Sequence, residues 1–151
     1  MPIMNQYLKV IIAVLALGLL AACAAPITQI PGGSDGQTLN ADDPQVTNSY
    51  ADIPIPLDDV LVVNESLLLN TGEQWTGRAV FRSKLSTSDV FTYFHQNMST
   101  YGWISITSVQ SEVSILTFEK ANRVATVQIN KRRVSGTEIK VTVTQREAVT
   151  N

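Results

Sequence analysis

Apolar and polar residues alternate along several segments of the second half of the chain, and this pattern constrains the fold more than any other feature. The alternating segments are 104–106, 115–120, 125–129 and 139–143. Because successive side chains of a strand point to opposite faces of its sheet, the alternation predicts strands with one buried face and one wet face. Turn-type residues at 110–112, 121–123 and 135–136 separate these segments, which predicts an antiparallel sheet.

Two strands and one helix are expected before these four strands. Residues 60–69 are apolar around a central polar trio, which predicts a bent or bulged strand, and residues 75–82 alternate again. Ser86 begins a capping box, apolar residues follow at helical spacing, and Gly102 stands where a helix often ends. The spacing therefore predicts a helix over 87–101.

The order β-β-α-β-β-β-β predicts an α+β domain of two layers over residues 53–151. An antiparallel sheet forms one layer. The single helix packs on one face of that sheet through Phe91, Phe94 and Met98.

The first 22 residues have the pattern of a secretory signal peptide. Lys9 supplies a positive charge ahead of an apolar run over 10–20, which is shorter than the roughly 20 residues of a membrane-spanning helix.

The motif Leu20-Ala21-Ala22-Cys23 resembles the lipobox of bacterial lipoproteins. This resemblance implies cleavage before Cys23, a lipid on its thiol, and a protein held at a membrane of the cell envelope. Ala24 rather than Asp after the cysteine favours the outer membrane, with the domain facing the periplasm. In a host with a single membrane, the domain would lie outside the cytoplasmic membrane. The alternative is an ordinary signal peptide with a chance cysteine.

Residues 23–52 differ in composition from the rest of the chain. Between Ala24 and Asp52 there are three Pro, three Gly and four Asp, and neither Lys nor Arg. Such a segment buries little apolar surface, so we predict a flexible tether with a root-mean-square span of roughly 30 Å.

The composition excludes several classes of protein. The net charge is −2, whereas a nucleic-acid-binding domain is usually basic. One Cys and one His supply neither an internal disulfide nor a structural zinc site. We therefore expect no metal, no cofactor and no nucleic-acid partner.

Part of the chain also resembles a small domain family of bacterial envelope lipoproteins that has no assigned activity. The likeness covers roughly residues 55–145, and the layout is similar to accessory lipoproteins of outer-membrane β-barrel assembly. Neither likeness transfers a catalytic residue. The residues that carry the first likeness are Met98, Gly102 and Trp103 at the helix end, and Leu116, Phe118, Lys120 and Arg123 in the following hairpin.

Four groups of residues are candidates for function. His95 lies at the edge of the apolar helix stripe without a partner for base catalysis, and Asp58-Asp59 reads as a solvated entry turn rather than a catalytic pair. The cluster at 131–133 has two interpretations: contact with an anionic surface or partner, and a charged turn that protects a sheet edge. The large aromatic residues fit core packing or an interface, with Trp75 the preferred interface residue.

The anionic surface in the first interpretation includes lipid headgroups, lipopolysaccharide phosphate and peptidoglycan. The residues named for that contact are Lys131, Arg132 and Arg133, and the other aromatic candidates are Tyr101 and Trp103.

These observations favour a non-enzymatic module that binds or scaffolds an envelope protein partner. The alternative is a carrier or sensor of a small amphiphile held between helix and sheet. An enzyme is the least supported class, because no nucleophile elbow, phosphate-binding loop or zinc-protease motif occurs.

Overall fold

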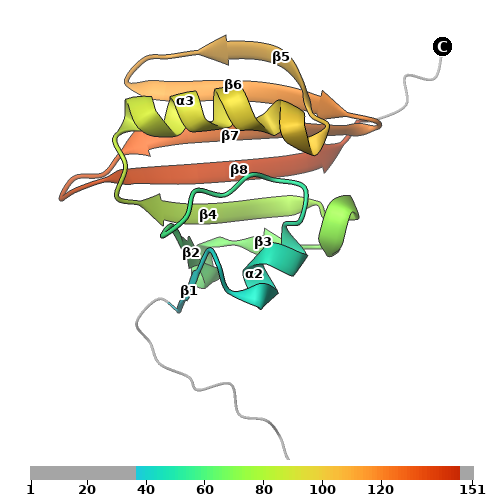
Figure 1. Ribbon diagram of the computed structural model, residues 1–151, viewed down its shortest axis with the longest axis horizontal. Coiled ribbons are helices and arrows are strands. Elements are labelled where there is room, and N and C mark those ends of the chain that lie inside the picture. The colour runs from blue at the N-terminus through green and yellow to red at the C-terminus, as the bar shows by residue number, and fades with distance from the viewer. Residues whose placement is uncertain (1–36, 147–151) are drawn as a thin grey trace, which may run out of the picture. The chain divides into compact units, whose positions relative to one another are not determined.

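The computed structural model describes residues 37–146 (Figure 1). The expected signal peptide, the lipobox and Cys23 lie outside the described residues, so those expectations stay predictions. Within the described range, none of the helices combines the length and apolar character needed to cross a membrane.

Eight strands form one sheet in which every pair is antiparallel. The strands are β1 (Thr38–Asn40), β2 (Val60–Val62), β3 (Leu67–Leu68), β4 (Gly77–Ser83), β5 (Ile104–Val109), β6 (Val113–Lys120), β7 (Arg123–Lys131) and β8 (Thr137–Gln145). Their order across the sheet is β1-β2-β4-β8-β7-β6-β5, and β3 pairs with β4 beside this path. Strands β1 and β5 are therefore the two edges.

The alternation in the sequence explains which face of the sheet is buried. Ala125, Val127 and Ile129 of β7 pair with Val143, Val141 and Ile139 of β8, and all six side chains are fully buried. The residues between them are only partly buried or exposed. The sheet thus has a core face and an opposite, wetter face, which we call the far face.

Helix α3 (Thr87–Asn97) covers the core face, as the sequence predicts. Ser86 caps its first turn by accepting a hydrogen bond from the Asp89 amide. A 3-10 turn, η3 (Met98–Tyr101), continues the helix, and Gly102 then takes the left-handed conformation at φ +83°. The α+β fold class, with an antiparallel sheet and one main helix packed on one face, is confirmed.

The buried side of α3 is formed by Val90, Phe94 and Met98. Phe91 is only partly buried.

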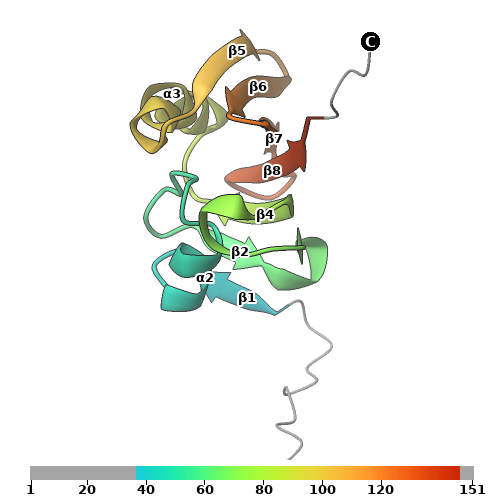
Figure 2. The same ribbon diagram turned by 90° about the vertical axis from the view of Figure 1, so that its right-hand side faces the viewer.

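The prediction of a flexible tether is wrong for residues 38–52. They form β1 and a short helix, α2 (Pro44–Ser49), which begins where the Asp43 side chain accepts a hydrogen bond from the Gln45 amide. Val46 and Tyr50 are 1% and 4% exposed, and both belong to the core. Two well-placed apolar side chains therefore anchor a segment whose average composition is polar. Figure 2 shows α2 and α3 on the same side of the sheet.

The predicted strand over 60–69 is broken in the expected place. A 3-10 turn, η1 (Val63–Glu65), separates β2 from β3. A second 3-10 turn, η2 (Gly72–Gln74), leads into β4. Across this break the Ser66 hydroxyl oxygen accepts a hydrogen bond from the Val80 amide at 3.0 Å, and β3 then pairs with β4 again from Leu67.

Candidate functional site

An open apolar groove lies at one end of the far face, where β3 meets β4 and β8. Its volume is about 480 Å³, within the range of small-molecule sites. Leu67 pairs with Arg78, and Arg78 pairs with Thr142, so these three side chains share the far face. The groove is lined by Leu67, Leu69, Thr76, Gly77, Arg78, Thr142, Val143, Thr144 and Gln145.

A glycine brings the two walls of the groove together. Gly77 has φ +134°, and a Cβ added there would lie 2.0 Å from the carbonyl oxygen of Leu67. Only glycine allows this approach of β3 to β4. The close approach of β3 to β4 at Gly77 thus fixes the place of Leu67 and Leu69 in the groove.

The chemistry of the groove is that of an amphiphile site. Leu67 and Leu69 are 57% and 65% exposed, and nothing among the described residues covers them. Arg78 is the one charged residue of the lining, is exposed, and forms no ion pair within residues 37–146. The apolar chain of a ligand could pack on the two leucines while its anionic group pairs with the guanidinium of Arg78.

The interface between helix and sheet is occupied by the protein's own side chains. Phe94 and Met98 of α3 are 0% exposed, and Leu116 and Phe118 of β6 are 0% and 2% exposed. A ligand between these layers would have to displace packed side chains, which costs several kcal/mol (roughly 2–5 for each large residue). The groove on the far face is therefore the better candidate.

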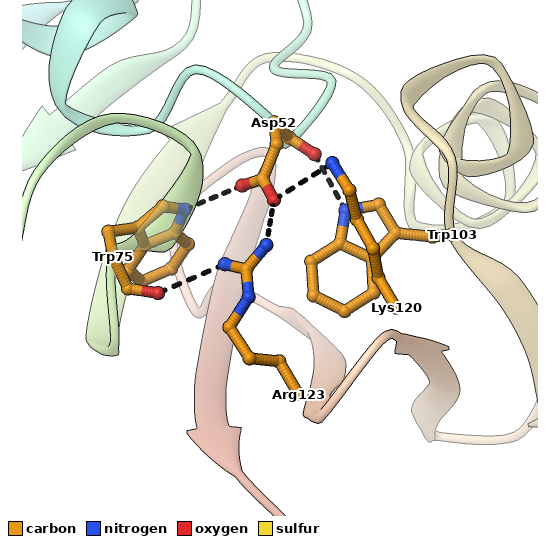
Figure 3. A network of polar contacts seen from close by, with 5 residues as sticks. All are labelled: Asp52, Trp75, Trp103, Lys120 and Arg123. Carbon is orange, nitrogen blue, oxygen red and sulfur yellow. Dashed lines mark hydrogen bonds and ion pairs between the residues drawn. The ribbon is translucent and has the colours of Figure 1, made fainter.

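A buried charge network joins the start of the domain to its core at the same end of the sheet (Figure 3). Asp52, just after α2, is 2% exposed, and its Oδ2 lies 2.5 Å from Nη2 of Arg123 and 3.2 Å from Nζ of Lys120. The indole N–H of Trp75 donates to Oδ1 at 3.0 Å. The indole N–H of Trp103 donates to the backbone oxygen of Asp52 at 2.7 Å.

The guanidinium of Arg123 is held on three sides. Besides its bond to Asp52, its Nη1 donates to the carbonyl oxygen of Trp75 at 3.2 Å, and its Cζ lies 5.1 Å from the centre of the Trp103 ring. Every buried polar atom of the Asp52 side chain has a partner. The arrangement is that of a structural clamp, because no reactive atom is free or accessible.

This network decides between the two interpretations of Trp75 in favour of core packing, so the preference for Trp75 as an interface residue is wrong. Its side chain is 0% exposed, its indole is committed to Asp52, and its ring packs edge-on against Tyr50 at 4.9 Å. Trp103 is also in the core, whereas Tyr101 is 41% exposed.

Asp59 corrects a second expectation, since only its neighbour Asp58 is solvated. Asp59 is 1% exposed, and its Oδ2 has no hydrogen-bond partner within the described chain. Burial raises the pKa of Asp59 to about 6; the Ser83 hydroxyl opposes the rise and Asp58 adds to it. The two adjacent carboxyls therefore lie in different environments, with Asp58 in solvent and Asp59 in the interior.

The remaining candidates do not form a common site. His95 is exposed and stacks on Phe91 with ring centres 6.0 Å apart. Lys131, Arg132 and Arg133 lie in the hairpin between β7 and β8, at the end of the sheet opposite the groove. Within residues 37–146, no three His, Cys, Asp or Glu side chains gather as a metal site would require.

Sequence reasoning missed the groove residues Leu67, Leu69 and Arg78. The one available signal was Gly77 in the middle of an alternating strand, since an isolated glycine there often marks a close backbone approach. Nothing local to residues 67–69 distinguished exposed leucines from buried ones.

Comparison with known proteins gives one match. No curated protein and no solved structure matches the chain. A family model described as START domain-like matches residues 63–147, which includes β3 to β8 and α3. Since this match spans more than half of the 151 residues, the chain belongs to the START domain-like family.

Proposed function

We propose that this protein is a lipid-anchored, non-enzymatic binding module that takes a small anionic amphiphile into the groove on its far face. The observation that carries the proposal is the groove itself, in which two exposed leucines stand beside one unpaired arginine. Membership of a START domain-like family supports a ligand-binding role. The lipid on Cys23, supported by the resemblance of residues 20–23 to a lipobox, would keep the domain at a membrane of the envelope, where amphiphiles are concentrated.

The two parts of the groove would have separate roles. Leu67 and Leu69 would bury the apolar chain, and each half-exposed leucine contributes about 1 kcal/mol when it is covered. Arg78 would hold a carboxylate or phosphate through charge-assisted hydrogen bonds. The groove is open to solvent, so a ligand would enter and leave it without a change of fold, as a carrier or sensor requires.

A direct test is binding of a fluorescent long-chain carboxylate to the chain from residue 24 onward. Replacing both Leu67 and Leu69 by Gln is expected to weaken binding roughly tenfold to thirtyfold, because about 2 kcal/mol of apolar burial is lost. Arg78→Gln is expected to weaken it about tenfold for the carboxylate and to leave binding of the uncharged alcohol unchanged.

Leu57→Gln is the matched control. Leu57 is 82% exposed and lies in a different hollow, beside Tyr101. Equal losses in the Leu57 variant and in the groove variant would place the ligand elsewhere. Tight binding that none of these variants changes would refute the groove.

A second candidate function is contact with an envelope protein partner along β5. All six residues of this edge strand are exposed, and Ile104, Ile106 and Val109 are 65%, 51% and 55% exposed. The strand has no charged residue, so its free backbone groups are open to another strand. Its test is crosslinking in intact cells of the native host, followed by recovery through a C-terminal tag. Loss of one dominant partner in Ile106→Lys, but not in Leu57→Lys, is the expected result, and equal recovery with both variants would exclude this edge.

A further inference from the structure

The end of the sheet opposite the groove carries a basic surface that the proposed function does not use. We call it the basic end, and its residues are Lys84, Leu85, Lys131, Arg132, Arg133 and Val134. The segment after β4 and the hairpin between β7 and β8 meet here, because Ser83 pairs with Thr137. The Thr137 hydroxyl also donates to the carbonyl oxygen of Leu85 at 2.8 Å.

The cations of the basic end have no acidic partner of their own. Residues 37–146 contain ten Lys and Arg side chains, of which five form ion pairs. Four of the other five belong to the basic end, and the fifth is Arg78 in the groove. Unpaired positive charge is thus concentrated at one end of the described domain.

The acids at this end do not neutralise it. Glu138 forms an ion pair with Lys140 at 2.8 Å, and Asp89, in the first turn of α3, accepts a hydrogen bond at 2.7 Å from the hydroxyl of the N-cap Ser86. Glu112 lies in the turn between β5 and β6, two strands away from β8. Four cations therefore face two acids that are not in ion pairs.

Protection of a sheet edge does not explain the cluster. Strands β7 and β8 are interior strands, flanked by β6 and β4. The long edge is β5, which carries no charge at all. A charged turn that guards against edge pairing would be expected there rather than at this hairpin.

Apolar tips and hollows accompany the charges. Val134 is 93% exposed at the tip of the hairpin, and Leu85 is 39% exposed beside it. Lys131 lines two hollows of about 340 and 310 Å³, one shared with Lys84 and the other with Arg132 and Arg133. Cations around headgroup-sized hollows, with an apolar side chain projecting between them, match the boundary of headgroups and acyl chains in a bilayer.

We propose that the basic end docks on an anionic lipid bilayer, with Val134 entering the interface and the surrounding cations binding lipid phosphates. Charge complementarity selects this occupant, and the exposed Val134 distinguishes it from a soluble polyanion, which would gain nothing from an apolar tip. Docking at this end would leave the groove, at the opposite end, turned away from that bilayer surface. The inference does not depend on what the groove binds.

The test uses the full chain with Cys23→Ala, a single cysteine in place of Val134, and a bimane label on that cysteine. The chain is reconstituted in vesicles of phosphatidylcholine with or without phosphatidylglycerol. The apolar residues 10–20 are expected to hold the chain on both vesicles, and co-sedimentation with each vesicle checks this, so that the label reports only how the domain lies. A label at Asn122, in the hairpin at the other end of β7, is the control position.

The label at position 134 is expected to shift to the blue, and to be quenched by nitroxide-bearing lipid, on anionic vesicles alone. The shift should disappear at roughly 1 M salt, where the Debye length is about 3 Å. Replacing Lys131, Arg132 and Arg133 together by Gln should lower the docking constant roughly a hundredfold, at about fivefold for each cation.

A matched triple variant, Arg78→Gln, Arg82→Gln and Arg146→Gln, removes the same charge from exposed side chains outside the basic end and leaves the Lys140–Glu138 pair intact. Thermal unfolding establishes that both triple variants are folded. Equal shifts on neutral and anionic vesicles, equal losses in the two triple variants, or a response to soluble polyphosphate without a response to vesicles would each overturn the proposal.

Discussion

Replacing Asp52 by Asn is expected to lower the free energy of unfolding by about 3–5 kcal/mol, the cost of leaving a buried ion without its partner. The size of the effect follows from the partner that remains. Arg123 is 3% exposed, and its guanidinium cannot reach water without leaving the core. Lys120, at 25% exposed, can turn outward, so it contributes little to the loss.

The reciprocal change should cost less. Arg123→Met leaves the Asp52 carboxylate with the Trp75 indole at 3.0 Å and Lys120 at 3.2 Å, so we expect a loss of about 2–3 kcal/mol. The double variant has neither charge and should be more stable than the sum of the two losses implies. The expected coupling energy is about 2 kcal/mol or more.

Urea unfolding, monitored by tryptophan fluorescence, measures the free energy of unfolding of the unchanged chain, the two single variants and the double variant. Both tryptophans of the chain, Trp75 and Trp103, contact Asp52 and are 0% and 2% exposed, so their emission reports the clamp directly. The control cycle is Glu65 with Arg82, a pair at 3.4 Å whose side chains are about 40% exposed. Its coupling energy should lie below about 1 kcal/mol.

A coupling between Asp52 and Arg123 no larger than that of the control pair would refute the reasoning. It would mean that the network is solvated in solution, and that α2 is held by Val46 and Tyr50 alone.

Three further perturbations test other parts of the structure. A chain that begins at Ile53 lacks Tyr50 and the clamp and should lose cooperative unfolding, whereas one that begins at Gln37 should keep it; near-ultraviolet circular dichroism of the two tells them apart. Because the folded pKa of Asp59 is about 6 and its ordinary value is 3.8, the folded state holds a proton that the unfolded state has lost between these values. The stability that this proton provides is present at low pH and is lost as the pH rises through 6, so the gain from Asp59→Asn should grow by about 2 kcal/mol between pH 4 and pH 7; a pH-independent difference would contradict the burial of this carboxyl. Gly77→Ala should cost about 2–3 kcal/mol in thermal unfolding, since its Cβ would meet the carbonyl oxygen of β3, whereas Gly72→Ala, at φ +71° with open space around it, should cost about 1 kcal/mol; similar costs would show that β3 moves freely.

Local signals were enough to predict most of the domain. Ser86 and Gly102 bound the helix because capping depends on residues a few positions apart. Alternation predicted β7 and β8 because burial on one face selects apolar residues at every second position. These are short-range effects, and a single sequence contains them.

Asp52 and Arg123 could not be predicted in the same way. Composition placed Asp52 in a tether, and turn-type neighbours placed Arg123 in a loop, yet the two form the most buried ion pair of the described chain. Their partnership depends on a fold that brings positions 71 residues apart into contact. The groove was missed for a related reason, since the exposure of Leu67 depends on how β3 pairs with β4.

The distance along the chain between Asp52 and Arg123 also sets an order in time. Because synthesis proceeds from the amino terminus, Asp52 is made long before Trp103 and Arg123, which lie 51 and 71 positions later. Until β6 and β7 have been made, Asp52 has neither Lys120 nor Arg123 to pair with, and closing so long a loop is slow. The segment that carries α2 is therefore expected to stay open to proteases until both of these strands have been made.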